Sequence, residues 1–324
     1  MWIGQTRGRE FSSTHKTLIL PNQEAQYWNY SFEEIGTDDI PALVNGVIAN
    51  RVGAGKCNKV SLLAHSSGLS AALVAGIKGG TGLTDRVGQI NGVAPCIKLN
   101  LSKFVLPDVR DLTSVQAFYD ILGRAGMTNL FGPQYATDIQ KVCDLPTFGA
   151  WLCDNYFSPA IVNPDLKQLS VKGYRHIHQN TIQGMLPGQG FYEYRADETD
   201  PAFVPYDLSA ISLPVKVLYG SNDIYCSPQD NLPFFSSIPN VTLEEALGAA
   251  NRDFCVYNDV SMADQIGSLL PQAAIPVLAT NLCPADECKK SDPECKRNQQ
   301  PEVEKKKKKK NAGAAVEKCS EEED

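Results

Sequence analysis

Residues 59–80 read KVSLLAHSSGLSAALVAGIKGG, and this stretch decides the fold. Its first part, Lys59 to Ala64, is compact and largely apolar and ends at a polar turn, which predicts a short buried strand. An Ala- and Leu-rich segment from about Ser67 predicts a buried helix, and Gly79-Gly80 supplies its stop signal. A strand that enters a helix through Ala64-His65-Ser66-Ser67-Gly68 is typical of a nucleophile elbow, the sharp turn that lifts a catalytic serine above a sheet edge.

The elbow assigns a role to each of its residues. The Ser66 hydroxyl is the predicted nucleophile, and the backbone N–H of Ser67, at the helix N-terminus, is the predicted donor to a developing oxyanion. We expect Ala64 and Gly68 to be small because neighbouring backbone passes close to such a turn. The alternative is a turn of the same composition without chemistry.

Two more segments extend the pattern. Residues 87–95 and 215–219 read as strands, so the chain alternates strands with helical segments and predicts an α/β fold with a mostly parallel sheet, covered on both faces. Asp223 follows the second of these strands in a Gly-Ser-Asn-Asp turn, where a carboxylate could orient an imidazole. The alternative is an aspartate that only forms the turn.

Composition excludes several classes of protein. The chain has 324 residues, is 43% hydrophobic and carries a net charge of −7. No run approaches the roughly 18–20 apolar residues of a spanning helix, which argues against an integral membrane protein. The acidic balance argues against nucleic-acid binding, and the one basic cluster, Lys305 to Lys310, is predicted to be a solvated tail.

Cysteine spacing predicts no metal site. Cys283, Cys288 and Cys295 lack the short pairs and the histidine partners that zinc sites favour, so these three either form one disulfide with a thiol left over or remain thiols. The first eight residues lack the basic-then-apolar layout of a secretory signal. The compartment is left open by the sequence.

Several motifs lie in order along the chain. They are WIGQTRG at 2–8, SSTHKTL at 12–18, YWNYSFEEIG at 27–36, DIPA at 39–42, AHSSG at 64–68, HIHQ at 176–179 and YGSND at 219–223. In this order they resemble the acid lipase family, the gastric and lysosomal lipases and their relatives, which are α/β-hydrolases with a helical lid insertion. The resemblance extends from Met1 to about Leu270.

The resemblance implies hydrolysis of neutral lipid esters, triacylglycerols or steryl esters, by a Ser-Asp-His triad without metal or cofactor. Carried over, Ser66 is the nucleophile, Asp223 the acid and Ser67 an oxyanion donor. The family's histidine opens an H-x-D-F stretch, and here Asn251 stands in its place. An asparagine amide cannot accept and return a proton near neutral pH, so the general base is expected to be missing.

No other histidine easily replaces it. The chain has four, and all of them precede Asp223, whereas this fold orders its triad as serine, acid, histidine. They are His15, His65, His176 and His178. By resemblance His65 is a structural neighbour of the nucleophile, and His176 and His178 make lid or core contacts.

The family also has a long segment before the WIGQTRG motif. Met1 falls inside what would be the family's fourth strand, so we expect N-terminal strands to be missing and two strand edges to lack partners. Three explanations remain open: another chain fills the gap, the strand at Trp2 shifts inward, or the sequence is an incomplete copy of a longer protein. The resemblance further implies a lid disulfide between Cys143 and Cys153.

These observations predict a hydrolase domain over residues 1–282, a cap inserted at about 100–205, and a charged tail over 283–324. Two functions are compatible with them. The first is an acid-lipase-like carboxylic ester hydrolase, strongly impaired by Asn251. The second is an inactive lipase-like protein that acts as a lipid-binding or assembly subunit. The sequence does not decide whether the chain is an enzyme.

Overall fold

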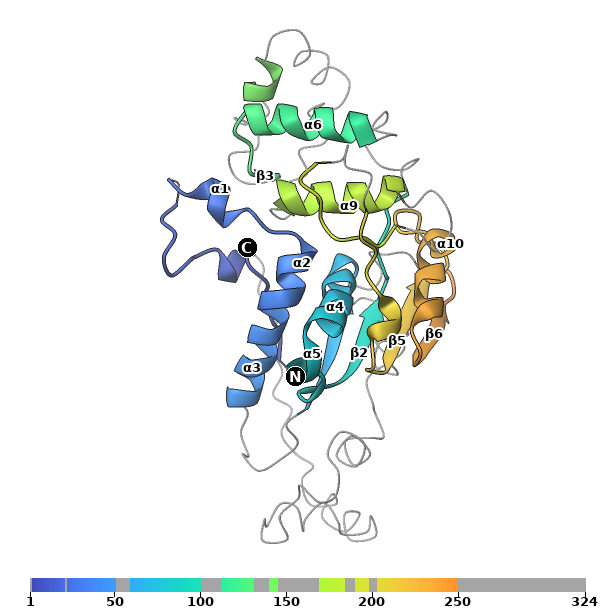
Figure 1. Cartoon of the computed structure of the whole chain (residues 1–324). Helices are drawn as coiled ribbons and strands as arrows, with labels where there is room; N and C mark the ends of the chain where they lie inside the picture. Colours follow the sequence, from blue (N-terminus) through green and yellow to red (C-terminus); the bar gives the residue numbers. More distant parts are fainter. Residues whose placement is uncertain are drawn as a thin grey trace, which may run out of the picture. The chain divides into compact units, whose positions relative to one another are not determined.

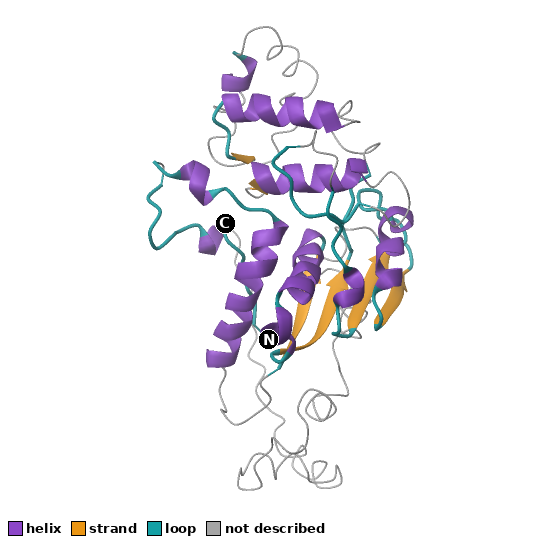
Figure 2. Ribbon diagram, viewed as in Figure 1, coloured by secondary structure: helices purple, strands orange, loops and turns teal. Residues whose placement is uncertain are grey.

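The computed structural model describes residues 2–20, 22–50, 59–100, 112–130, 140–144, 169–183, 190–197 and 203–249. These residues contain a four-stranded parallel sheet in the order β1-β2-β5-β6 (Figure 2). The strands are β1 (Val60–His65), β2 (Val87–Val93), β5 (Val215–Gly220) and β6 (Val241–Ala246). The strands predicted at 59–64, 87–95 and 215–219 are therefore confirmed to within two residues, and the sheet has the predicted parallel, α/β character.

The register of the sheet aligns the carboxyl ends of its strands. His65 of β1 pairs with Val93 of β2, and Val93 pairs in turn with Leu218 of β5. Gly220 of β5 pairs with Ala246 of β6. Because all four strands are parallel, the loops that follow them leave the sheet at the same edge.

Helix α4 (Ser67–Lys78) follows β1 after one residue and packs against β1 and β2 (Figure 1). Every residue from Leu69 to Gly76 is buried, as expected of a helix that is apolar all round. The predicted stop is confirmed, since α4 ends at Lys78 and Gly79 caps it, but α5 (Gly80–Thr84) begins immediately afterwards.

Further helices share the core that α4 forms with the sheet. These are α2 (Phe32–Glu34), the π-helical turn η2 (Ile35–Asp39), α3 (Ile40–Asn50), η5 (Leu208–Ala210) and η6 (Leu232–Ser237). The short helix α10 (Pro228–Asn231) leads directly into η6. One cluster of buried side chains joins residues of α4, the strands and η6, among them Leu73, Val217 and Phe235. We expected cover on both faces of the sheet, and the described helices account for one face.

The N-terminal segment differs from the prediction. Residues 2–6 form no strand, and η1 (Glu10–Ser12) and α1 (Glu24–Tyr27) follow them. The backbone donors of this segment find partners other than a β-ladder: Arg7 N donates to Asp39 Oδ2 (2.8 Å) and Phe11 N to Gln5 Oε1 (2.9 Å). The expectation that the chain begins within a strand is therefore wrong.

Within the predicted insertion at 100–205, the described residues form α6 (Leu112–Arg124), α9 (Val171–Gln183) and a short antiparallel pair of β3 (Asn129–Leu130) with β4 (Leu169–Ser170). Helices α6 and α9 meet where Tyr119 Oη lies 2.9 Å from His178 Nδ1. The ring of His176, also on α9, stacks on Phe32 of α2 at 3.9 Å between centroids. The predicted boundary at 282 and the tail lie outside the described residues.

Candidate active site

Ser66 occupies the single residue between β1 and α4. Its backbone has φ 55° and ψ −127°, a conformation that costs a non-glycine residue on the order of 1–3 kcal/mol. Ser66 N donates to Val93 O (2.9 Å) and Leu69 N donates to Ser66 O (3.0 Å), so both the neighbouring strand and the new helix hold the turn. The hydroxyl makes no capping hydrogen bond to α4, which leaves it available for chemistry at the sheet edge.

Ser67 is the first residue of α4. The first N–H groups of an α-helix have no partner within the helix and carry its partial positive charge. The Ser67 N–H therefore belongs to a set of donors suited to an anion beside Ser66.

The small residues around the turn act differently from the expectation. A Cβ placed on Gly68 would lie 3.9 Å from Ala64 Cβ, an ordinary contact, so the turn would accommodate alanine there. The close approach is found on β2 instead, where a Cβ on Gly92 would lie 2.3 Å from Leu69 Cδ2. The expected role of Gly68 is thus corrected: Gly92 lets the first turn of α4 lie against the sheet.

A second strained residue lies at the same edge. Ala94, directly after β2, has φ 49°, and its N–H donates to Leu218 O (2.8 Å). Ser66 and Ala94 are the two non-glycine residues with positive φ in the part of the chain that the structure describes. Such strain concentrates at functional sites, and here both residues flank the point where β1 and β2 end.

Asp223 lies in the loop after β5 and is 4% exposed. Its Oδ1 accepts hydrogen bonds from Tyr225 N (3.0 Å) and Cys226 N (2.9 Å). These bonds are the pattern of a turn-forming aspartate, which is the alternative named for this residue. Asp223 Oδ1 is thereby held by the backbone of its own loop. The role of Asp223 as the acid stays a prediction.

The sheet brings the Ser66 and Asp223 loops to one edge. β1 and β5 lie on either side of β2, and strands two apart are separated by about 10 Å. A hydroxyl after β1 and a carboxylate after β5 thus leave room for one side chain between them. In a serine hydrolase, that position belongs to the general base.

Three of the four histidines have partners elsewhere. His176 directs Nδ1 at Ser31 Oγ (3.1 Å) and Nε2 at Tyr192 O (2.7 Å), and His178 Nδ1 lies 2.9 Å from Tyr119 Oη. The exposed His15 accepts through Nδ1 from the N–H of Leu18 (2.9 Å), within its own turn. His65 is the last residue of β1, half-buried and directly before Ser66.

Asn251 lies outside the described residues, but the chain that leads to it is placed. β6 pairs with β5, and after β6 the N–H of Asn222 donates to Ala249 O (2.9 Å). Residue 249 therefore lies beside the residue that precedes Asp223.

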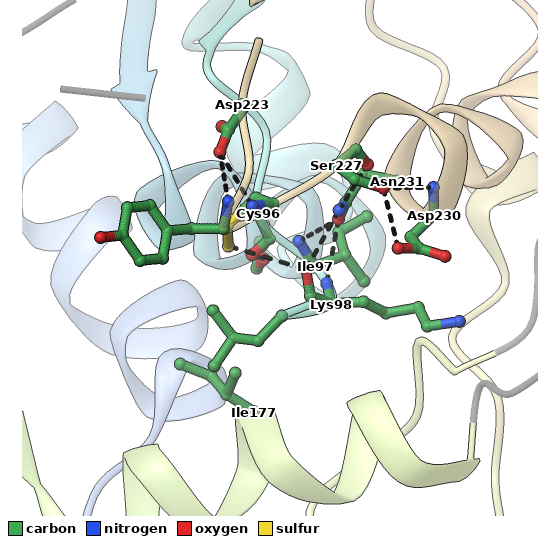
Figure 3. The surroundings of a disulfide bond; sticks show 12 residues. Cys96, Ile97, Lys98, Ile177, Asp223, Ser227, Asp230 and Asn231 are labelled. Carbon is green, nitrogen blue, oxygen red and sulfur yellow. Dashed lines mark hydrogen bonds between the residues drawn. A yellow bond between two sulfur atoms is a disulfide. The ribbon is translucent and has the colours of Figure 1, made fainter. Parts of the chain in front are cut away.

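One feature of this edge was not predicted. Cys96, after β2, forms a disulfide with Cys226, which lies in the Asp223 loop (Figure 3). Cys143 is also disulfide-bonded, and its predicted partner Cys153 lies outside the described residues. Because ten cysteines allow many pairings, spacing alone could not have identified the first bond.

The described residues contain no set of three or more His, Cys, Asp or Glu that could hold a metal ion. Among the described helices, none has the length and apolar character needed to cross a bilayer.

The sequence is similar to those of several lipases. No family model matches the chain. Lipase 1 of Drosophila melanogaster is 22% identical over 258 residues, which cover 75% of this chain and 56% of that protein. Gastric triacylglycerol lipase of Rattus norvegicus is 24% identical over 294 residues, which cover 80% of this chain and 70% of the relative. The chain thus spans little more than half the length of the first of these relatives.

Among solved structures, the chain is similar to an alpha/beta fold family hydrolase from Bacillus anthracis. The TM-score is 0.40 at 14% sequence identity, over 82% of this chain and 80% of that one.

Proposed function

We propose, on the premise that this chain is a distant homologue of the acid lipases with a lipase- or esterase-like α/β-hydrolase fold, that it is a carboxylic ester hydrolase of neutral lipids whose turnover is strongly reduced. Its substrates are triacylglycerols or steryl esters. The observation that carries the proposal is the conformation of Ser66, with φ 55° and ψ −127° between a parallel strand and a buried helix.

The proposed reaction begins at Ser66. Its oxygen attacks the ester carbonyl carbon, and the carbonyl oxygen becomes an oxyanion beside the N-terminus of α4. The Ser67 N–H donates a hydrogen bond to that oxyanion, an interaction that is stronger in the transition state than in the bound ester. The proton of the Ser66 hydroxyl must leave as the new bond forms.

The reduced turnover follows from where that proton can go. Asp223 is the proposed acid, and it would orient and stabilise an imidazolium that this chain does not supply after β6, because Asn251 occupies the position. Loss of the histidine in a serine hydrolase lowers turnover roughly a millionfold, on the order of 8 kcal/mol of barrier. The chain would then bind ester and attack it very slowly.

A second function is favoured by the same residue. If Asn251 reflects loss of catalysis, the chain is an inactive lipase-like protein that binds lipid esters or assembles with another protein. Among the described strands β1 pairs only with β2, so its other edge is where a strand of a protein partner would pair.

The test compares covalent labelling with hydrolysis. A fluorophosphonate probe and a short-chain nitrophenyl ester are incubated with the unmodified chain, with Ser66→Ala and with Ser236→Ala, whose exposed serine is the matched control. We expect slow labelling and slow hydrolysis that Ser66→Ala abolishes and Ser236→Ala retains. Binding of a fluorescent steryl ester without any labelling of Ser66 would instead support the inactive reading, and rapid hydrolysis that survives Ser66→Ala would refute both.

A further inference from the structure

Two loops at the site edge are joined by a buried disulfide. Cys96 and Cys226 are 130 residues apart in sequence, and their Cα atoms lie 5.1 Å apart. Both side chains are buried, at 5% and 4% exposure. The bond connects the loop after β2 to the loop after β5 that carries Asp223 (Figure 3).

The Asn231 side chain makes a second connection between the same loops. Its Oδ1 accepts from Ile97 N (2.8 Å) and Lys98 N (2.9 Å), and its Nδ2 donates to Lys98 O (3.0 Å) and Ser227 O (3.1 Å). An amide offers two acceptor sites and two donors, so all four are used. Asn231 is fully buried, and the loss of these bonds would leave backbone groups of both loops unsatisfied.

The disulfide acts directly on the proposed acid. Cys226 N, which belongs to the bonded cysteine, donates to Asp223 Oδ1 (2.9 Å), and Tyr225 N donates to the same oxygen (3.0 Å). A displacement of Cys226 would therefore displace a donor that holds this oxygen.

The same disulfide reaches the helix of the proposed nucleophile. Ser70 Oγ donates to Cys96 O (3.1 Å), and Ser70 lies four residues after Ser66, on the first turns of α4. Contacts thus run without a break from α4 through Cys96 and Cys226 to Asp223.

From these contacts we infer that the Cys96–Cys226 disulfide and Asn231 form a clamp that positions the Asp223 carboxylate relative to Ser66. The inference rests on the proposed function, in which Asp223 is the acid. Cys96, Cys226 and Asn231 are positioning residues, because they act on the reaction only through Asp223.

The first test measures local opening. Hydrogen exchange of the Tyr225 and Cys226 amides is followed in the unmodified chain, in the double variant Cys96→Ser with Cys226→Ser, and in Asn231→Leu. We expect exchange at both amides to rise about tenfold or more in each variant, because the Asp223 loop loses either the disulfide or the Asn231 bonds and keeps only the other one and the hydrogen bond from Asn100 N to Tyr225 O (2.7 Å). Asn91→Leu is the matched control: Asn91 is equally buried but bonds to Ser61 and Leu62 of β1, so exchange at 225–226 should not change.

If the double cysteine variant or Asn231→Leu fails to fold, hydrogen exchange is measured in Asn231→Asp in its place. It keeps the two acceptor bonds and places a carboxylate oxygen against Lys98 O and Ser227 O, so we expect faster exchange there too. Unchanged exchange at Tyr225 and Cys226 in every folded clamp variant overturns the inference.

The second test separates positioning from general stability. In the Asn251→His background, an aligned Asp223 should raise the pKa of the introduced imidazole, and loss of the clamp should move the acid limb of the kcat/KM profile to lower pH. We expect kcat to fall about tenfold with KM unchanged. An unchanged pH profile contradicts a positioning role. If Asn251→His shows no hydrolysis at all, the proposed function fails. The clamp is then tested by the hydrogen exchange of Tyr225 and Cys226 alone.

Discussion

The Ser66 backbone is held in a conformation that serine rarely adopts. Its φ of 55° and ψ of −127° are angles that glycine adopts without steric cost, whereas a residue with a side chain is strained there. Two hydrogen bonds hold this conformation: Ser66 N donates to Val93 O, and Leu69 N donates to Ser66 O. The strain has a function under the proposal, because it presents the hydroxyl at the sheet edge.

Replacing Ser66 by glycine should therefore stabilise the protein. We expect Ser66→Gly to raise the free energy of unfolding by about 1 kcal/mol, since relief of strain exceeds the entropy cost of glycine in the unfolded chain, and to raise Tm by about 2–4 °C. Calorimetry measures it. Ser236→Gly, at an exposed residue without positive φ, should lower Tm, and a lower Tm in Ser66→Gly would contradict the strain argument.

At this scale the sequence identified Ser66 and Asp223 as candidate site residues, but it did not predict all of the contacts around them. A strand, a serine and a helix within ten residues form a local pattern, so the elbow was visible. The Cys96–Cys226 bond joins residues 130 apart, and nothing local marks either cysteine. The importance of Gly92 was missed for the same reason, because its close contact is with another element.

At the scale of elements, α4 is the centre of the packing. It lies against β2 through Gly92 and against η2 through Gly36, where a Cβ would lie 2.6 Å from Ala71 O. Two glycines thus let two neighbouring elements approach the same helix. The N-terminal segment shows the opposite case. The family resemblance predicted a strand at Trp2, but Trp2 and Ile3 lie outside any strand and are 57% and 86% exposed, because a strand also needs a ladder partner that local sequence does not reveal.

The packing of α4 on β2 can be tested with one methyl group. Gly92→Ala should lower the free energy of unfolding by about 1–3 kcal/mol, because its Cβ would overlap the fully buried Leu69 side chain. Gly46 lies in the exposed part of α3, where an added Cβ would meet no atom outside the helix within 4 Å, so Gly46→Ala should raise the free energy of unfolding by about 0.5–1 kcal/mol. Urea unfolding measures both, and a Gly92→Ala variant as stable as the unmodified chain would refute the close approach.

At the scale of the whole molecule, buried ionisable groups make stability depend on pH. Burial lowers the pKa of His176 and of His178 from 6.5 to about 4. Burial, the largest single influence, would raise the pKa of Glu33 and Glu34. Hydrogen bonds from Lys78 and Lys172, backbone hydrogen bonds and the charges of these lysines together outweigh it, so both pKa values are lowered. The histidines therefore change the free energy of unfolding at higher pH than the two glutamates do.

The sign follows from which state binds protons. As pH falls below about 6.5 the unfolded chain protonates its histidines while the folded chain does not, so the stability that they contribute is complete above 6.5 and is lost toward pH 4. We expect a loss on the order of 1 kcal/mol per pH unit for each histidine between pH 6.5 and 4.5. The lowered glutamate pKa values add a further loss below about pH 4.5.

Unfolding at several pH values checks this prediction. His178→Gln should make the free energy of unfolding less steep between pH 6.5 and 4.5, whereas His15→Gln, at an exposed turn, should leave the slope unchanged. Equal slopes in the unmodified chain and in His178→Gln would show that the buried imidazole is not the cause.

The central claim is that Ser66 and Asp223 lack a group able to carry a proton between them. The most direct measurement is kcat/KM for a short-chain ester in Asn251→His, with and without Ser66→Ala. We predict a rise of about a hundredfold or more over the unmodified chain, the scale of general-base catalysis, and its complete loss when Ser66→Ala is added. No rise in Asn251→His, or an unmodified chain that already turns over as fast as the variant, would contradict it.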